Sequence, residues 1–434
     1  MNKMENKEII SNLSTKLYGI GIFEINSKLI QIIFLKSILD DVKRYQNLKV
    51  DDLKVIFEYS QAFNENKIDK TLLYETLKII AKINGIYESS LAMAIDVYRF
   101  YFEGNNQEKI NNLLRQIELP FEYEKRKSLI KDILQYSGIN GGRYSFEKIS
   151  SPTIVNLASS ILNVQKEDCV LNTFAGYSAF SLNLPECKII DGYDINVECN
   201  TISNMIKIMC GIYNLNINLG DFYADNEQFL RRYDKIFTDG PLALKLNINE
   251  TSYLYSKYLT NDADIINILK TIDLLKNEGT AVVTSPNKIF ISVTRQCISL
   301  RQYLSDTGLK AIITLPSNVL YGSGVLINLL VIQKGYTGDI LLINSNDDKL
   351  YDSTKAIKNI TSTGIKKIKS IYDNFEVIEG VSCIKSRKEL FGDGTRPIQL
   401  QQYFYVEKKK IYRSIKDIDN DIQNIMNELI SINK

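Results

Sequence analysis

The sequence predicts an α/β protein with an open parallel sheet, a helical region before the sheet and a coiled-coil helix after it. Three patterns support this fold class. Short apolar runs alternate with helical spacing between residues 169 and 242, and each run ends on a polar residue or a glycine. Residues 1–137 carry helical spacing with few glycines or prolines, and residues 411–432 carry a continuous heptad pattern. Strands that alternate with helices are typical of parallel sheets, which bind ligands at the carboxyl ends of their strands.

The length of 434 residues is that of two or three domains. We expect a helical domain over residues 1–137, an α/β domain over 138–334, a mixed α/β extension over 335–405 and a terminal heptad helix over 406–434. The first boundary is placed where glycines and serines gather before Pro152, a residue favoured in the first turn of a helix.

Composition excludes several kinds of site. The chain has no histidine, which excludes Ser-His-Asp and Cys-His nucleophiles and any metal site that needs imidazole, so we expect no metal. Its six cysteines are scattered without a Cys-x-x-Cys pair, which favours reduced core thiols in a cytoplasmic protein. A net charge of +2 does not by itself indicate nucleic acid. With neither a signal peptide nor an apolar run long enough for a membrane, we expect a soluble chain with no membrane contact.

Residues 1–137 show helical spacing in several segments. Asn26 and Ser27 offer an N-cap before the apolar stretch 29–42. Similar spacing recurs over residues 53–63, 72–83 and 89–102. No catalytic pattern is visible in these segments, so an accessory helical domain is the plainer interpretation, and a DNA-contacting role stays open.

Two strands frame a glycine loop. The first, residues 169–171, leads into a turn built on Gly176, and an amphipathic segment follows. The second, residues 188–193, ends on Asp194, which lies 18 positions after that glycine. A carboxylate at this distance suits the hydroxyl groups of a ribose held across the strand ends. An ordinary turn at Gly176 and a helix cap at Asp194 are the structural alternatives.

Two further strands also end on polar residues. Residues 215–219 lead to Gly220, Asp221 and Phe222, and residues 233–238 lead to the tetrad that begins at Asp239. Asp239 could also be a simple turn residue. A dinucleotide site of the NAD type is disfavoured, because the G-x-G-x-x-G pattern is absent.

After residue 242 the expected elements are a helix over 262–277, a strand over 280–284, a helix that ends near Leu304, and strands over 309–316 and 340–345. The sequence Tyr-Gly-Ser-Gly at residues 321–324 separates two apolar runs, which indicates an antiparallel pair at one edge of the sheet.

The last part of the chain carries an apolar stripe whose residues are spaced alternately by four and three positions over three heptads. These residues are Ile411, Ile415, Ile418, Ile422, Ile425, Leu429 and Ile432. A stripe of two positions in seven is narrow, which favours docking against one partner helix over packing on the chain's own body.

The order of these motifs resembles that of a known family. The glycine loop, the acid after the second strand, Gly-Asp-Phe and the Asp-x-Pro tetrad precede a distinctive stretch, residues 300–334, with a helix, Leu-Pro and a glycine hairpin. Together they are similar to the modification (M) subunits of type I restriction–modification systems, which are N6-adenine DNA methylases. The resemblance covers about residues 138–405, and the helical amino-terminal region and heptad tail also fit the layout of this family.

The resemblance implies the Rossmann-like fold of class I S-adenosylmethionine-dependent methyltransferases. It implies S-adenosylmethionine as methyl donor and an adenine flipped out of double-stranded DNA as acceptor, with no metal. It also implies that a partner, either a specificity subunit that chooses the DNA target or another methylase-like subunit, binds through the heptad stripe.

Family roles transfer onto two groups of residues. The cofactor-binding positions are Asn172, Phe174, Gly176 and Ser178 beside the methionine part, Asp194 on the ribose, Ile195 against the adenine, and Asp221 with Phe222 closing that pocket. The catalytic positions are Asp239, Gly240, Pro241 and Leu242. The Asp239 side chain and the Gly240 carbonyl would accept hydrogen bonds from the target amino group and so direct the nitrogen lone pair toward the sulfonium methyl.

Several positions depart from the family pattern. The family loop, D-P-x-x-G-x-G-G-F, keeps here only one of its three glycines, Gly176, and Asn172 replaces the leading carboxylate. In the family tetrad, [NDS]-P-P-[YF], the first proline has become Gly240 and the aromatic residue has become Leu242. An aromatic residue there would stack on the flipped base, an interaction worth about 1–3 kcal/mol.

Two functions therefore stay open on sequence alone. In the first, the chain is a working methyltransferase subunit that depends on a specificity subunit to find its DNA target. In the second, it is a catalytically degenerate methylase-fold protein that acts as a structural or DNA-binding partner. Family membership favours the first function, and the altered motifs favour the second.

Overall fold

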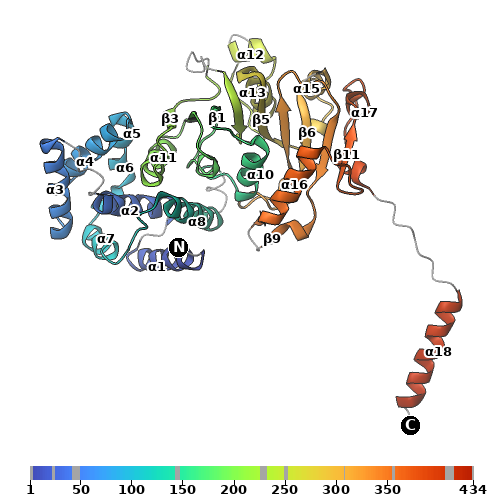
Figure 1. Cartoon of the computed structure of the whole chain (residues 1–434), viewed down its shortest axis with the longest axis horizontal. Coiled ribbons are helices and arrows are strands. Elements are labelled where there is room, and N and C mark those ends of the chain that lie inside the picture. The colour runs from blue at the N-terminus through green and yellow to red at the C-terminus, as the bar shows by residue number, and fades with distance from the viewer. Residues whose placement is uncertain are drawn as a thin grey trace.

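The fold is that of an α/β protein with a helical amino-terminal part, as the sequence predicts (Figure 1). The coordinates are a computed structural model that describes residues 3–21, 25–41, 49–141, 147–224, 232–248, 253–306, 308–353, 357–405 and 415–432. Among the helices in these ranges, none is both long enough and apolar enough to cross a membrane. The six cysteines carry free thiols, and five of them are buried.

The amino-terminal part is a bundle of helices. They are α1 (Lys3–Gly19), α2 (Ile25–Asp40), α3 (Val50–Glu65), α4 (Lys70–Ile83), α5 (Glu88–Ala92), α6 (Ala94–Val97), the 3-10 helix η2 (Arg99–Phe102), α7 (Asn106–Leu114) and α8 (Tyr123–Gly141). Helix α2 already begins at Ile25, so the N-cap expected at Asn26 and Ser27 is wrong. The single helical segment expected over residues 89–102 is divided among α5, α6 and η2.

Helix α8 continues to Gly141, past the boundary expected near Gly138. Gly138 is buried, and a Cβ atom at this position would lie 2.2 Å from the ring of Tyr321. This glycine therefore permits close packing of α8 against the α/β part, where its sequence context suggested a linker. The division of the chain into domains stays a prediction.

A buried ion pair joins two of the amino-terminal helical segments. The guanidinium of Arg126, in α8, donates to both carboxylate oxygens of Asp41, just after α2, at 2.6 and 2.9 Å. The side chains of both residues are 4% exposed. Arg126 Nε also donates to the carbonyl of Pro120 at 2.6 Å, so the guanidinium has partners on both of its edges.

The central sheet has nine strands in the described part of the chain, in the order β11-β8-β6-β7-β5-β4-β1-β2-β3. Their bounds are β1 (Cys169–Asn172), β2 (Ile189–Asp194), β3 (Leu215–Leu219), β4 (Tyr233–Thr238), β5 (Leu275–Pro286), β6 (Leu309–Thr314), β7 (Ile327–Gln333), β8 (Ile340–Asn344) and β11 (Ser382–Lys385). A separate two-stranded sheet pairs β9 (Tyr351–Ser353) with β10 (Lys358–Ile360). Strands β3, β2, β1, β4 and β5 run parallel to one another.

The antiparallel pair expected at a sheet edge lies in the interior of the sheet instead. Strand β7 pairs antiparallel with β5 on one side and with β6 on the other. Strands β8 and β11 then extend the sheet beyond β6. The apolar run of β7 is almost continuously buried, which is typical of a strand covered on both faces and explains its interior place.

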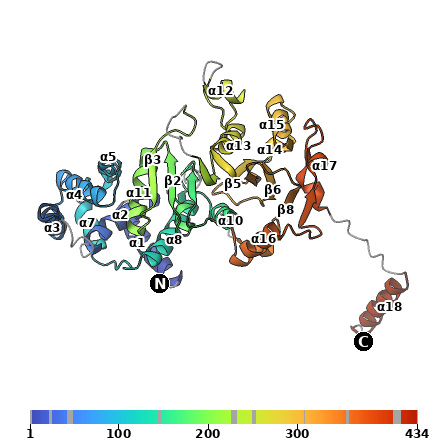
Figure 2. The same cartoon turned by 45° about the horizontal axis from the view of Figure 1, so that its top comes forward.

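The helices of the α/β part form a layer on each face of the sheet (Figure 2). Helices α10 (Pro152–Leu162), α11 (Val197–Cys210) and α16 (Ser362–Asn374) share one apolar core with the amino-terminal bundle. The opposite core contains α13 (Ala263–Leu274), α14 (Lys288–Ile291), α15 (Arg295–Asp306), α17 (Arg387–Phe391) and the 3-10 helix η6 (Leu400–Phe404). Helix α12 (Tyr253–Tyr258) precedes α13, and the short 3-10 helix η5 (Asp348–Leu350) precedes β9.

Two connections differ from the expected pattern. After the glycine loop, the chain forms only a 3-10 helix, η3 (Ser181–Asn183), where an amphipathic segment was expected. Phe180 turns into the core and stacks on Phe237 of β4 at a ring-centroid distance of 4.4 Å. Helix α13 ends at Leu274, and the following residues already belong to β5, so the helix expected to reach residue 277 is too long.

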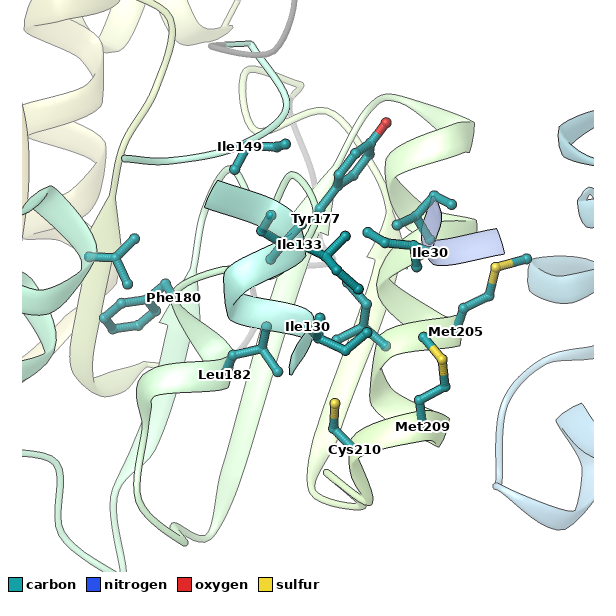
Figure 3. Packing of buried hydrophobic residues seen from close by; sticks show 14 of the residues in the cluster. Ile30, Ile130, Ile133, Ile149, Tyr177, Phe180, Leu182, Met205, Met209 and Cys210 are labelled. Atoms are coloured by element: carbon teal, nitrogen blue, oxygen red, sulfur yellow. The ribbon is translucent and has the colours of Figure 1, made fainter. Parts of the chain in front are cut away.

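Helix α11 lies between the sheet and the amino-terminal bundle, and its residues from Cys199 to Cys210 are all buried. In Figure 3, Met205 and Met209 of this helix lie beside Ile30 of α2 and Ile130 of α8. The amino-terminal bundle therefore shares a continuous apolar core with the α/β part.

The heptad tail forms helix α18 (Ile415–Ile432). Ile411 lies outside the described residues, as do the side chains of Ile415, Ile418 and Ile432. The stripe residues whose side chains are described are Ile422, Ile425 and Leu429, and they are 50–56% exposed.

We expect Arg126→Met to lower the free energy of unfolding by about 3–5 kcal/mol, because it breaks the buried, two-bond ion pair with Asp41. Urea unfolding followed by circular dichroism measures the change. The double variant Asp41→Leu with Arg126→Met removes both charges and should lose much less. If the single and the double variant lose the same free energy of unfolding, then lost packing, and not the broken ion pair, causes the destabilisation.

Candidate functional site

The predicted site residues come together along one edge of the sheet. Strands β4, β1 and β2 are adjacent and parallel, and their carboxyl ends carry Asp239, Asn172 and Asp194. The end of β3, next in the sheet, carries Asp221. The predicted positions therefore lie together at this edge of the sheet, and we call the place the rim crevice, after the crevice that the sequence predicts there.

The glycine loop uses its own backbone donors within the chain. Ala175 N donates to the Tyr193 carbonyl, Gly176 N to Asp194 Oδ2, Tyr177 N to the Lys148 carbonyl and Ser178 N to the Ala175 carbonyl, each at 2.8 Å. These four successive amides are thus all committed to acceptors in the protein.

Gly176 is needed where it stands for two reasons. Its φ of +51° is in the left-handed region, and a Cβ atom there would lie 2.2 Å from the Lys148 carbonyl oxygen. The residues before α10 therefore lie directly against this loop. The close approach that the glycine permits is to the chain's own backbone.

Ser178 occupies a position at which a glycine would be unstrained. Its φ is +58°, a conformation that costs a side-chain-bearing residue about 1–2 kcal/mol. Its hydroxyl and the Asn172 Oδ1 atom are buried and have no hydrogen-bond partner. The loop thus keeps a left-handed shape although it has lost glycine, and it leaves two buried polar atoms unsatisfied.

Tyr177 lies in the apolar core and not in the rim crevice. It is 2% exposed, and Figure 3 shows it near Ile133 and Ile149. Its hydroxyl donates to Glu198 Oε1 at 2.8 Å, and Lys148 Nζ contacts Glu198 Oε2 at 2.6 Å. The Tyr177 side chain therefore points into the core and does not line the rim crevice.

Asp194 ties the loop to the start of α11. Its Oδ2 atom accepts from Gly176 N and its Oδ1 atom from Asn196 N, both at 2.8 Å. Burial raises the pKa of Asp194, and the two amide hydrogen bonds and nearby Lys148 only partly offset it. The next residue, Ile195, is 69% exposed at the edge of the crevice. Both the structural and the ribose-binding interpretations of Asp194 are compatible with this geometry.

An aromatic cluster fills the side of the crevice beside Asp221. Phe222 is 2% exposed, and the ring of Phe174 packs edge-on against it at 5.0 Å between centroids. Phe174 also lies 5.6 Å from the ring of Tyr223, whose hydroxyl donates to Asn267. Asp221 accepts from Tyr223 N at 2.8 Å. Phe222, expected to contact a cofactor, is therefore covered by side chains of this protein.

The tetrad follows β4 and is embedded in the same cluster. Gly240 is buried, and a Cβ atom there would lie 2.6 Å from Phe174 Cε2 and 2.6 Å from Asn267 Nδ2. Leu242 is half-buried and packs against the core on the α10 and α11 face, while Pro241 is exposed.

Asp239 is half-buried at the end of β4. Burial raises its pKa, while hydrogen bonds with the Ser150 and Thr284 side chains work in the opposite direction. A carboxyl group that stays costly to ionise is typical of functional positions.

Sequence reasoning missed an ionic network that anchors the segment after the tetrad. Lys288 Nζ contacts Asp262 Oδ2 at 2.7 Å and Asp264 Oδ2 at 3.0 Å, and Lys245 contacts Asp262 at 2.8 Å. Asp264 also accepts from Ala243 N at 3.1 Å, directly after the tetrad. Burial works to raise the pKa of Asp262, but hydrogen bonds from both lysines outweigh it and lower the value. The available signal in the sequence was the pair of acids at the start of α13 and the lysine at the start of α14.

We expect Asp239→Asn to stabilise the protein at pH 7. The folded-state pKa is raised, so the ionised carboxylate destabilises the fold above that pKa, and the effect vanishes below the unfolded value of about 3.9. Thermal melting of both proteins at pH 7 and near pH 3.5 should show a higher melting temperature for the variant only at pH 7. A variant that melts lower than the parent at pH 7 would mean that Ser150 and Thr284 bind the carboxylate strongly enough to reverse the sign.

Comparison with known proteins adds family information to this geometry. The sequence matches the family model described as N-6 DNA Methylase over residues 158–410, more than half of the chain. A search of curated proteins finds no match.

Several solved structures are similar. The methyltransferase subunit of a type I restriction-modification system from Streptococcus thermophilus has a TM-score of 0.73 at 15% identity, covering 92% of this chain and 99% of that one. A modification subunit from Vibrio vulnificus has a TM-score of 0.63 at 13% identity, covering 92% and 96%. A chain of a type I R-M system, solved for its complex assembly, has a TM-score of 0.64 at 12% identity, covering 99% and 96%.

At these identities the structural likenesses establish the fold, which is the Rossmann-like class I methyltransferase fold predicted from the strand and motif order. The family itself follows from the sequence match, which includes the loop, the acid, Gly-Asp-Phe and the tetrad. The resemblance to M subunits is confirmed, and the chain belongs to the N-6 DNA methylase family.

Proposed function

We propose that this chain is a subunit of a DNA adenine-modification complex of the type I restriction–modification kind, in which it acts as a structural partner and transfers no methyl group itself. The observation that carries the proposal is the glycine loop, in which all four amides from Ala175 to Ser178 donate to acceptors within the chain. Membership of a methylase family does not decide activity, because one fold hosts many functions.

S-adenosylmethionine is the methyl donor that the family implies. The residues of the rim crevice suit its adenosine part better than its methionine part. A carboxylate has about four lone-pair sites, so Asp194 retains acceptor capacity for ribose hydroxyls beyond its two amide bonds. Ile195 offers an exposed apolar surface beside it.

The methionine half of the cofactor lacks partners. Its carboxylate needs hydrogen-bond donors, and the loop amides are already used. The Asn172 Oδ1 atom, an acceptor suited to an ammonium, is buried without a partner and has no accessible surface. Phe222 is covered by Phe174. The residues present therefore do not fit the whole cofactor, and we derive no transfer step through it.

The residues that would hold the methyl-accepting adenine support the same proposal. A flipped adenine gains about 1–3 kcal/mol from stacking on an aromatic ring, and position 242 offers only a leucine that packs toward the core. Gly240 keeps a carbonyl acceptor, but Phe174 and Asn267 lie against its Cα.

A second candidate function is a working adenine methyltransferase, and one observation favours it. Asp239 stands at the end of β4 with a raised pKa, where its carboxylate and the Gly240 carbonyl would accept hydrogen bonds from the amino group of a target adenine. The unpaired Asn172 and Ser178 atoms would then find partners after rearrangement of the loop.

In both candidates the expected partners are double-stranded DNA and a specificity subunit that selects the target. The structure solved for type I complex assembly is similar to this chain over nearly its whole length, which supports an assembly role. We assign the contact with the specificity subunit, or with another methylase-like subunit, to the apolar stripe of α18.

Charges beside the stripe favour a different chain over a second copy. Asp419, Asp421 and Glu428 occupy the positions that flank the apolar seam, and all three are exposed. Within the described part of α18, none of the flanking positions is basic, so a second copy would offer these acids no opposite charge there, whereas a helix with basic flanking residues would pair with them. The exposed Met426 beside Ile422 and Ile425 widens the apolar surface on one side. This pattern fits a helix of a specificity subunit that carries lysines or arginines along its seam.

We expect titration calorimetry of S-adenosylmethionine into the full chain, alone and with a specificity subunit, to give no binding heat at micromolar protein concentrations. The reason is that the loop amides already donate to acceptors in the chain and that Phe174 covers Phe222, so neither can contact the cofactor. Micromolar binding that Asp194→Ala abolishes, in a variant whose melting temperature shows that it is folded, would favour the second candidate function.

We expect the double variant Ile422→Asp with Leu429→Asp to lose assembly with the specificity subunit while the rest of the chain stays folded. Two carboxylates would stand in the apolar seam, and light scattering after size exclusion reports the complex. Asn420→Asp with Asn424→Asp adds the same charges to the outer face of α18 and should leave assembly unchanged. Assembly that survives the seam variant would place the contact elsewhere.

A further inference from the structure

A cavity of about 750 Å³ lies outside the rim crevice, where the amino-terminal bundle meets the outer strands of the sheet. Its walls come from the turn after α4, from α5, from α11 and from β2 and β3, which neighbour one another in Figure 2. The lining includes Tyr87, Ser90, Asn204, Lys207 and Asp191, and its surface is mostly polar. Cavities of this size and place, between two parts of a fold, are typical of small-molecule sites.

Lys207 is the unusual residue in this cavity. It is 5% exposed, and its ammonium makes no hydrogen bond or ion pair with the residues that the structure describes. Burial is the only cause that lowers the pKa of Lys207, so no carboxylate compensates its charge. A buried lysine is usually paired, because removing an ammonium from water is costly.

The position of Lys207 in α11 keeps its ammonium group from being solvated by bulk water. From Cys199 to Cys210 every residue of α11 is buried between the sheet and the amino-terminal bundle, so the polar residues of this stretch do not form a solvated face. Asn204 and Lys207 of this helix line the cavity, and Asn200 lies one helical turn before Asn204. Asn204 donates to the Asn200 carbonyl at 3.0 Å, and the Asn200 Nδ2 donor is buried without a partner. This side of the helix has more donors than acceptors.

Among the described residues that line the cavity, Asp191 is the one with a carboxylate, and neutral donors already engage it. Asp191 accepts from the Tyr233 hydroxyl at 2.9 Å and from Asn216 Nδ2 at 3.1 Å. It makes no ion pair with Lys207 among the described contacts. The cavity therefore presents a lysine without an ion-pair partner among the described residues and several amide and hydroxyl groups, while its Asp191 carboxylate already accepts two hydrogen bonds, and a free cation of this kind can receive an anion.

We propose that this cavity binds a small anion, whose phosphate or carboxylate group accepts hydrogen bonds from Lys207. The anion would neutralise the buried ammonium and, through Ser90 and Tyr87, also contact the amino-terminal bundle. It would thereby join the bundle to α11 and β3 at a place away from the rim crevice, and the inference does not depend on whether the chain transfers methyl groups.

The test is titration calorimetry of inorganic phosphate, and separately of acetate, into the full chain at constant ionic strength. Saturable binding of phosphate alone would identify a phosphate-bearing ligand, and saturable binding of acetate alone a carboxylate-bearing one. Lys207→Met should weaken that binding by at least about ten-fold, since a hydrogen bond to a charged group is lost. Lys207→Arg, which keeps the charge, should retain it.

Lys349→Met is the matched control, because it removes an exposed lysine near β8, toward the opposite end of the sheet. It should bind the same anion as the parent does. Thermal melting of Lys207→Met without added anion should show a folded protein, since methionine fits an apolar helix face and avoids the burial of a charge. Failure of both anions to bind saturably, or binding that Lys207→Met leaves unchanged, would overturn the proposal.

Discussion

The burial of α11 on both of its sides is the constraint on which the rest of the structure depends. One side of the helix packs on β2 and β3, and the other on α2, α5 and α8. The helix begins three residues after Asp194, and Glu198 in its first turn accepts from Tyr177 of the glycine loop. Packing of the amino-terminal bundle is therefore transmitted to the rim crevice, so that the position of the loop depends on residues far away in sequence.

Compared with the family pattern, the rim crevice keeps the strand ends that frame it, but the residues inside it differ. Strand ends still deliver Asp194 and Asp239 to one edge, which the alternation of apolar runs and polar ends requires. Within that framework, the loop amides donate to acceptors of the chain itself, Phe174 packs on Phe222, and Leu242 packs toward the core. A strained residue such as Ser178 normally persists because function or surrounding packing holds it. Here the contact between the loop and Lys148 supplies packing of that kind.

Features that depend on residues close together in the sequence were predictable, and features that depend on residues far apart in the sequence were not. Strands β1 to β4 and their end residues were predictable, because each is marked by a local apolar run with a polar terminus. The interior place of β7 was not, since it depends on β8 and β11, which follow later in the chain. The burial of Tyr177 and the contact of Phe174 with Gly240 depend on pairs of residues distant in sequence, as does the environment of Lys207. The spacing of apolar residues predicts which face of a helix is buried. In α11 the residues from Cys199 to Cys210 are all buried, polar ones included, and the sequence pattern did not indicate this.

The contact between Phe174 and Gly240 has a consequence for how this sequence can change. A proline at position 240 would put ring atoms where the Phe174 side chain lies, since even a Cβ atom would come within 2.6 Å of it. Trimming Phe174 first would leave a void against Phe222, and voids in a packed cluster are costly. A return to proline at position 240 is therefore destabilising as a single substitution, and it requires a compensating change at Phe174. Through this contact the glycine loop and the tetrad constrain each other, so that neither can change independently.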